Sequence, residues 1–148
     1  MSYYTFTINV EREDPLKLRD QLINYDGKRA IFDLDKLICL NQVKMALKHA
    51  DTAFAQSVNI AKVWGIEVAL HLAATHQIQT ALDLLGISSS TKRIGVIQEV
   101  PTIELKQVSE GLKIKDPDIE LLERYGISQN SACLDIISKG VELVVDHE

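Results

Sequence analysis

Residues 59–75, NIAKVWGIEVALHLAAT, carry the pattern that decides how this chain folds. Apolar side chains occupy nearly every face of a helix drawn over 60–75, and Asn59 stands where a helix N-cap is preferred. A helix that is apolar all round cannot lie on a solvent-exposed surface. We therefore expect this helix either at the centre of the fold or covered by a partner.

A strand and a helix are predicted at the start of the chain. Residues 3–10 alternate between two faces, as the residues of a half-buried strand do. Asp14 and Pro15 are a suitable N-cap and first helical residue, so we expect a helix over 15–25. Residues 30–32 are predicted to form a second strand or an extended connector.

A long helix is predicted over 34–56, opened by the cluster Asp33-Leu34-Asp35. Lys44 and Lys48 share one side of this helix, and an apolar stripe at helical spacing occupies the other. The stripe consists of Leu40, Val43, Leu47, Ala50 and Phe54.

Five further elements follow the central helix. Residues 77–85 predict a short helix that ends at a left-handed Gly86, with an inward face made of Ile78, Ala81, Leu82 and Leu85. The others, in chain order, are a strand over 94–100, a helix over 103–112, a helix from Asp116-Pro117 to Gly126, and a helix over 131–145 for which a strand is the alternative.

The order of these elements predicts the fold class. The helices follow one another in the middle of the chain instead of alternating with strands, which favours α+β over α/β. We expect one domain over residues 1–148, with a small sheet of about three strands and five or six helices packed on it.

Composition limits the classes of function. The 148 residues carry 21 acidic and 16 basic side chains, so any contact with nucleic acid must come from a local basic patch. No apolar run approaches the roughly 20 residues that cross a bilayer, and the N-terminal residues lack a secretory pattern. We expect a cytoplasmic protein without membrane contact.

Cys39 and Cys133 have no metal-binding or disulfide-framework spacing and are expected to be buried thiols.

Glu67, His71 and His76 form the one group that suggests chemistry. Such residues can hold a metal ion or transfer protons, but their order differs from the H-E-x-x-H signature of zinc enzymes. The simpler interpretation is a Glu67–His71 hydrogen bond at the edge of the core, with His76 exposed in a turn. Because no nucleophile elbow or phosphate loop is present, we expect no enzyme activity, no metal and no cofactor.

Several short segments occur in a characteristic order between residues 31 and 87. They are IFDLDKLI at 31–38, ALKHA at 46–50, NIAK at 59–62, GIEVAL at 65–70, and Gln77-Ile78, Ala81 and Gly86-Ile87. Their order and spacing resemble the kinase-binding small subunit of the KEOPS complex, the TPRKB family, in the short form of its archaeal members.

The resemblance implies a non-catalytic role. Members of the family bind the small-lobe side of the PRPK-type atypical kinase/ATPase, promote its activity, and hold the 3′ CCA end of tRNA. The complex makes N6-threonylcarbamoyladenosine at position 37 of tRNA, and a different, metal-dependent subunit performs the transfer.

Candidate tRNA contacts follow from the charged residues. A cap at Asn59 would place Lys62 in the first turn of the central helix, where free N–H groups and the positive end of the helix dipole favour phosphate. Lys62 is therefore the leading candidate. Lys44, Lys48, Lys92 and Arg93 are the others.

Candidate kinase contacts are apolar residues on helix faces that the sheet leaves uncovered. Leu84 is preferred because it lies off the predicted inward face of its helix, and Ile66 and Leu70 are added from the central helix.

Two other functions remain open. One is a protein-binding adaptor that never contacts RNA, and the other is an enzyme that uses Glu67, His71 and His76 around a metal.

Overall fold

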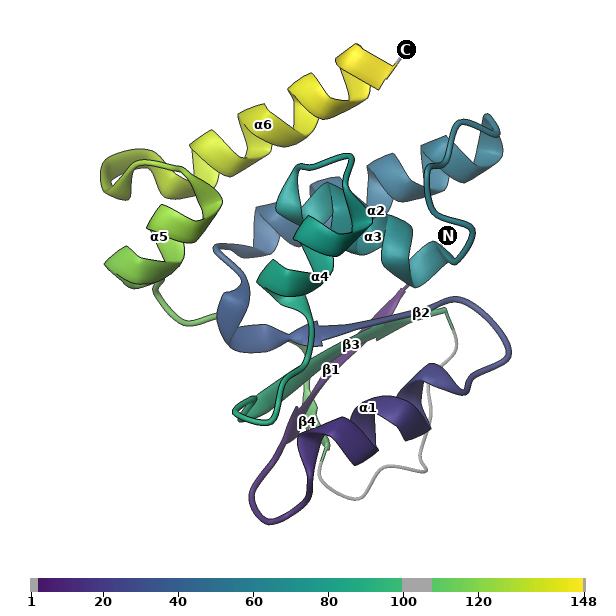
Figure 1. Ribbon diagram of the computed structural model, residues 1–148, viewed down its shortest axis with the longest axis vertical. Coiled ribbons are helices and arrows are strands. Elements are labelled where there is room, and N and C mark those ends of the chain that lie inside the picture. Colours follow the sequence, from purple (N-terminus) through teal and green to yellow (C-terminus); the bar gives the residue numbers. More distant parts are fainter. Residues whose placement is uncertain (1–2, 100–107, 148) are drawn as a thin grey trace.

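A four-stranded antiparallel sheet divides the helices into two unequal groups (Figure 1). The computed structural model describes residues 3–99 and 108–147, and the strand order within them is β2-β3-β1-β4. The strands are β1 (Tyr4–Asn9), β2 (Arg29–Asp33), β3 (Arg93–Gln98) and β4 (Val108–Glu110). The predicted α+β class is confirmed, and β4 adds one strand to the three expected.

Six α-helices and two short 3-10 helices occur in the described residues. They are α1 (Pro15–Ile23), α2 (Leu40–Ala55), α3 (Trp64–Ala73), α4 (Ile78–Leu85), α5 (Ile119–Tyr125), α6 (Ala132–His147), η1 (Leu34–Lys36) and η2 (Gln129–Ser131). Helix α1 lies on one face of the sheet, and α2 to α6 are stacked on the other (Figure 1). No helix among the described residues is both long enough and apolar enough to cross a bilayer.

Side-chain alternation in the strands produces a core on each face of the sheet. Phe6 and Ile94 point to α1 and pack with Leu18 and Leu22. Ile97 points the other way, into the larger core around α3. The chain therefore builds two cores from one sheet, and the larger one carries most of the buried apolar side chains.

Helix α3 is the central helix, as its all-round apolar pattern predicts. It contacts β2, α2, α4 and α6, and its Val68, Leu70 and Leu72 are fully buried. Gly65 permits the close approach to β2, because a Cβ there would collide with the backbone oxygen of Arg29. Burial of α3 on several sides places its two polar residues, Glu67 and His71, inside the protein.

The predicted start of α3 at residue 60 is wrong, because a side chain of the helix itself holds the preceding segment in a turn. Glu67 Oε1 accepts the N–H groups of Ile60 and Ala61 at 2.9 and 2.8 Å. Asn59 does not act as an N-cap, since its Nδ2 donates to the oxygen of Ala61. The helix begins at Trp64 with Val63 as its N-cap.

The predicted helix over 34–56 is divided into η1 and α2. Asp33 accepts the N–H of Asp35 and caps the short 3-10 turn, after which Leu37 returns to extended backbone. Helix α2 then begins at Leu40, where Gln42 Oε1 accepts the N–H of Ile38 at 2.8 Å. A glutamine three residues into the helix thus closes its N-terminus.

Other boundaries differ in smaller ways. The predicted helix over 103–112 lies partly outside the described residues, and its described part forms strand β4 along β1. Gly86 has φ −67° and so does not form the expected left-handed cap, whereas Gly126 does, at φ 71°. The C-terminal segment is the predicted helix and not the alternative strand.

The expectation of two buried thiols is wrong. Cys39 and Cys133 form a disulfide with an S–S length of 2.01 Å, and both residues are half-buried. The bond joins the N-cap of α2 to the beginning of α6, across 94 residues of chain. Pairing at that separation depends on tertiary packing, which the spacing of the cysteines does not reveal.

Candidate functional site

A pocket lies between α2, α3, the turn before α3, and the C-terminal half of α6. It offers about 50 Å³ for the centres of water molecules, enough for several of them. Its walls are largely apolar, and its polar members are three histidines, one carboxylate and two other side chains. These polar members are His49, Thr52, Gln56, Glu67, His71 and His76.

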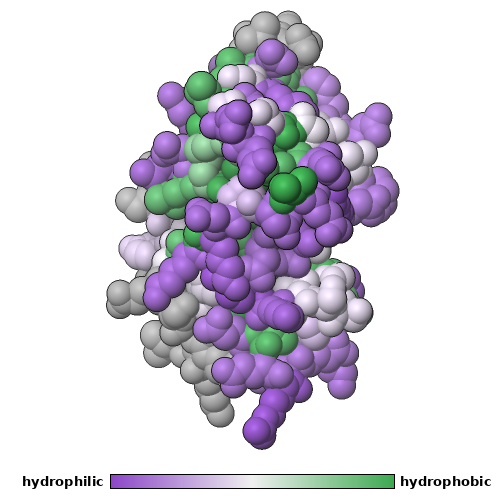
Figure 2. Space-filling view, turned by 90° about the vertical axis from the view of Figure 1, so that its left-hand side faces the viewer, coloured by the Kyte–Doolittle hydropathy of each residue, from purple (hydrophilic) through white to green (hydrophobic). Residues whose placement is uncertain are grey.

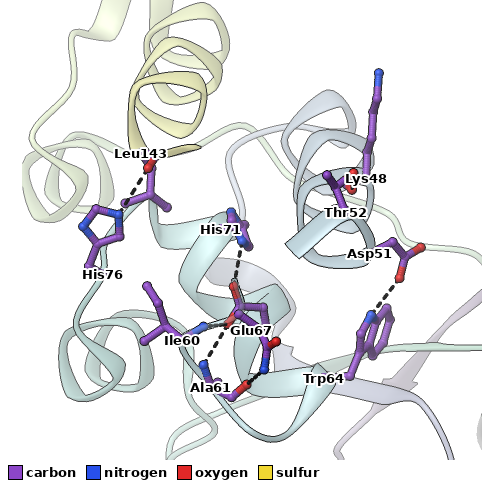
Figure 3. A network of polar contacts seen from close by, with 11 residues as sticks. Lys48, Asp51, Thr52, Ile60, Ala61, Trp64, Glu67, His71, His76 and Leu143 are labelled. Carbon is purple, nitrogen blue, oxygen red and sulfur yellow. Dashed lines mark hydrogen bonds and ion pairs between the residues drawn. The ribbon is translucent and has the colours of Figure 1, made fainter. Parts of the chain in front are cut away.

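Glu67 and His71 make a buried hydrogen bond at this pocket (Figure 3). Glu67 Oε2 lies 3.0 Å from Nε2 of His71, and both residues are more than nine-tenths buried. Burial alone would raise the pKa of Glu67, but the bonds from His71, Ala61 and Ile60 outweigh it and lower that pKa. Because an ionised carboxylate only accepts hydrogen bonds, Nε2 of His71 carries the proton. The predicted hydrogen bond at the edge of the core is confirmed.

His49 is the pocket histidine that the sequence pattern did not single out. It lies on α2, and its ring is edge-on to the His71 ring with 5.7 Å between the ring centres. Burial, together with His71 and Lys48, lowers the pKa of His49. Nδ1 of His49 and Nδ1 of His71 are both buried without a hydrogen-bond partner among the described atoms. The feature that could have indicated burial of His49 is its place between Ala46 and Ala50, two alanines of α2 that are both buried.

His76 is exposed, as predicted, and lies at the rim of the same pocket. Its Nε2 is 3.2 Å from the backbone oxygen of Leu143 in α6 (Figure 3). Across residues 3–99 and 108–147, no three or more histidine, cysteine or acidic side chains are arranged to hold a metal ion. Glu67, His71 and His76 therefore do not form the three-ligand centre that an enzyme hypothesis required.

Lys62 is exposed in the turn before α3, so its predicted place in the first helical turn is wrong. It precedes the N-cap residue, Val63, because Glu67 holds residues 60 and 61 outside the helix. Lys62 thus keeps its exposure but not the predicted support of the helix N–H groups.

The other four cations fall into two separate groups. Lys44 and Lys48 are exposed one turn apart on α2, and Figure 3 shows Lys48 projecting away from the buried network. Lys92 is exposed just before β3. Arg93 is engaged, because Nη2 and Nε lie 2.6 and 2.8 Å from Asp35 Oδ1 and Nη1 donates to the oxygen of Lys113.

The structure does not bring all five cations together. Lys62 is two residues from Trp64, whose ring stacks on Tyr3 at the start of β1. The oxygen of Lys92 accepts the N–H of Val10, just beyond the end of β1. The length of the strand therefore separates Lys62 from Lys92 by roughly 20 Å.

A polar cluster around Asp51 lies near Lys62 and was missed in the sequence. Asp51 accepts hydrogen bonds from the Tyr3 hydroxyl and from Nε1 of Trp64, at 2.7 and 2.9 Å. Lys28 lies 3.5 Å from the same carboxylate. These contacts join Asp51 to three other segments of the chain, so only a three-dimensional structure reveals them.

The residues expected to face the kinase are largely buried. Leu84 is 8% exposed and Leu70 is 1% exposed, and both belong to the larger core, while Ile66 is half-buried against it. The predicted inward face of α4 is confirmed for Ala81 and Leu85, which are buried, and is wrong for Ile78 and Leu82, which are 37% and 39% exposed. Packing of α4 on α3 and η1 turns Leu84 inward instead.

Apolar surface is concentrated on the helical half of the protein. Figure 2 shows it over the upper part of one face, whereas the lower part of that face is mostly hydrophilic. Exposed apolar side chains of this half include Ile78, Leu82, Val63, Leu134 and Val141. A surface of this kind is typical of contacts with other macromolecules.

A scan against protein-family models and a search of the curated proteins both give no match to this chain.

Proposed function

We propose that this chain is a non-catalytic accessory subunit of a KEOPS complex in the cytoplasm. In this role it binds and activates the PRPK-type kinase/ATPase, and it holds the tRNA 3′ CCA end for N6-threonylcarbamoyladenosine modification at position 37. The resemblance of residues 31–87 to the kinase-binding small subunit is the starting point of the proposal.

One observation carries the proposal further than the sequence. The segments that carry the resemblance form β2, η1, α2, α3 and α4, and these elements pack against one another around α3. Residues dispersed between 31 and 87 thus build one continuous body.

The exposed side of this body supports contacts with RNA. Lys44, Lys48 and Lys62 are exposed and can neutralise phosphates, while Lys92 and Arg93 form a second group at the far end of the sheet. With a net charge of −5, the protein would bind RNA through these local groups and with little non-specific affinity. Because acidic residues outnumber basic ones, a second candidate function remains open, that of an adaptor that binds protein alone.

The exposed face of α4, and not the buried Leu84, is the surface that would contact the kinase. Ile78 and Leu82 are four residues apart, so they lie on the same side of the helix. Both are about 40% exposed and are free to contact a partner without unfolding the core.

Co-elution with a PRPK-type kinase tests the protein-binding part of the proposal. The wild-type chain should co-elute in size-exclusion chromatography, and Leu82→Glu should abolish co-elution while leaving the circular dichroism spectrum unchanged. Ile23→Glu is the matched control, because Ile23 is 62% exposed on α1, on the other face of the sheet. Failure of the wild-type chain to bind, or equal loss in both variants, would contradict the proposal.

A further inference from the structure

The Cys39–Cys133 disulfide fastens the beginning of α6 to the body of the fold. It joins the N-cap residue of α2 to the second residue of α6, and the two Cα atoms are 5.8 Å apart. Both residues are half-buried, so each keeps some contact with solvent, from which a reductant must approach. The sequence has two cysteines in all, so the bond has no competing thiol within the chain.

Helix α6 rests on α2 and α3 with one face. Ile136 has no exposed surface, and Gly140 lies against the side chain of Met45 in α2. On the opposite face, Leu134 and Val141 are 66% and 47% exposed. The contact side of α6 also closes the pocket between α2 and α3, which Leu143 and Val144 help to line.

The two ends of α6 are held in different ways. The disulfide holds the beginning, whereas near the other end the oxygen of Leu143 lies 3.2 Å from Nε2 of the exposed His76. The preceding helix, α5, does not need the disulfide, because the Tyr125 hydroxyl bonds both the oxygen of Lys36 and the side chain of Gln42. Loss of the disulfide would therefore weaken the attachment of α6 specifically.

The chemistry of such a bond depends on its compartment. In a reducing cytoplasm, disulfides that form are usually transient, catalytic or redox-sensing. A protein dithiol opens the bond in two steps. Its thiolate attacks one sulfur to give a mixed disulfide and one free cysteine, and its second thiol then displaces the other cysteine and leaves as a disulfide. Two electrons and two protons thus pass from the dithiol to Cys39 and Cys133.

We propose that the Cys39–Cys133 bond is a redox switch. The disulfide keeps α6 closed over the pocket, and reduction by a dithiol protein of the thioredoxin class lets α6 open away from α2 and α3. The oxidised form of the same carrier closes the bond again by the reverse exchange. The proposal rests on the cytoplasmic location in the proposed function and not on its kinase or tRNA partners.

Thiol trapping tests whether the bond can be reduced in the folded protein. Reduced thioredoxin is added to the full-length chain without denaturant, free thiols are alkylated, and mass spectrometry gives the fraction reduced. We expect both cysteines to become alkylated while the circular dichroism spectrum stays that of a folded protein. A bond that opens only in denaturant is a permanent structural crosslink, and that result would overturn the proposal.

Hydrogen–deuterium exchange of the oxidised and reduced wild-type protein tests the opening of α6. Exchange in α6 should rise roughly tenfold more than exchange in α1, which lies on the other face of the sheet and reports overall stability. The Cys39→Ser/Cys133→Ser variant should behave like the reduced protein whether or not a reductant is present. An equal rise in α1 and α6, or no rise in α6, would show that the bond does not control this helix.

Discussion

Nε2 of Gln42 lies 3.1 Å from the hydroxyl oxygen of Tyr125, which joins the N-terminus of α2 to α5. The same amide nitrogen donates to the oxygen of Leu72 at 2.8 Å, and Gln42 has no exposed surface. The Tyr125 hydroxyl in turn donates to the oxygen of Lys36. One buried side chain therefore connects η1, α2, α3 and α5.

Gln42→Leu should lower the free energy of unfolding by about 2–4 kcal/mol, because it leaves several buried polar groups without a partner. Tyr125→Phe should cost less, about 1–2 kcal/mol, since it removes one hydroxyl from the network. Urea denaturation of both variants and of the double variant measures the coupling between them. Strictly additive losses would show that the two side chains do not act together.

Reduction of the Cys39–Cys133 bond should destabilise the protein by about 2–5 kcal/mol, because the bond closes a loop across 94 residues. Thermal unfolding with and without a reductant measures this loss. The Cys39→Ser/Cys133→Ser variant is the control, and its melting temperature should not respond to the reductant. An unchanged melting temperature of the wild-type protein after complete reduction would contradict this prediction.

Stability should fall as the pH decreases below about 6.5, and His49 should be one cause. The pKa of His49 is lower in the folded protein than its ordinary value of 6.5, so the unfolded chain binds its proton first. The stabilisation is therefore complete above pH 6.5 and is lost as the pH falls through the folded pKa. Glu67 contributes separately at lower pH, because its ordinary value is 4.5 and its folded pKa is lower still.

Urea denaturation between pH 7.5 and pH 5 measures this dependence. His49→Gln cannot titrate and should show a smaller loss of stability over the same range. An identical pH dependence in the wild-type protein and the variant would exclude His49 as a cause.

Gly65→Ala should destabilise the protein by about 1–3 kcal/mol through overpacking. The new methyl group would collide with the backbone oxygen of Arg29 in β2, which cannot move aside as a flexible side chain can. Gly140→Ala is an informative comparison, because its methyl group would meet the flexible end of the Met45 side chain. Chemical denaturation should therefore show a smaller loss for Gly140→Ala, and the reverse order would refute this account.

Local patterns predicted the elements whose residues interact within a few turns of chain. Asp14 and Pro15 open α1 as expected, and Asp14 Oδ1 accepts the N–H of Leu16. The alternation of residues 3–10 likewise predicted β1. In these places the local preference and the tertiary packing agree.

Predictions failed where a contact that the local pattern does not encode decides the outcome. Glu67 delays the start of α3 by binding the N–H groups of Ile60 and Ala61. In α4, leucines at 82, 84 and 85 make the helical pattern ambiguous, and contact with α3 and η1 determines that Leu84 is buried together with Leu85 while Leu82 is exposed. The disulfide and the His49–His71 pair depend on chain segments that only the fold brings together.

Binding of tRNA with and without its 3′ CCA sequence is the most direct test of the central claim, measured by gel shift at several salt concentrations. We predict that intact tRNA binds, that removal of CCA abolishes binding, and that Lys62→Glu weakens it. Lys17→Glu, an equal change of charge on the exposed surface of α1, should have no effect. Binding that persists without CCA, or an absence of binding to intact tRNA by the complex with its kinase, would contradict the account.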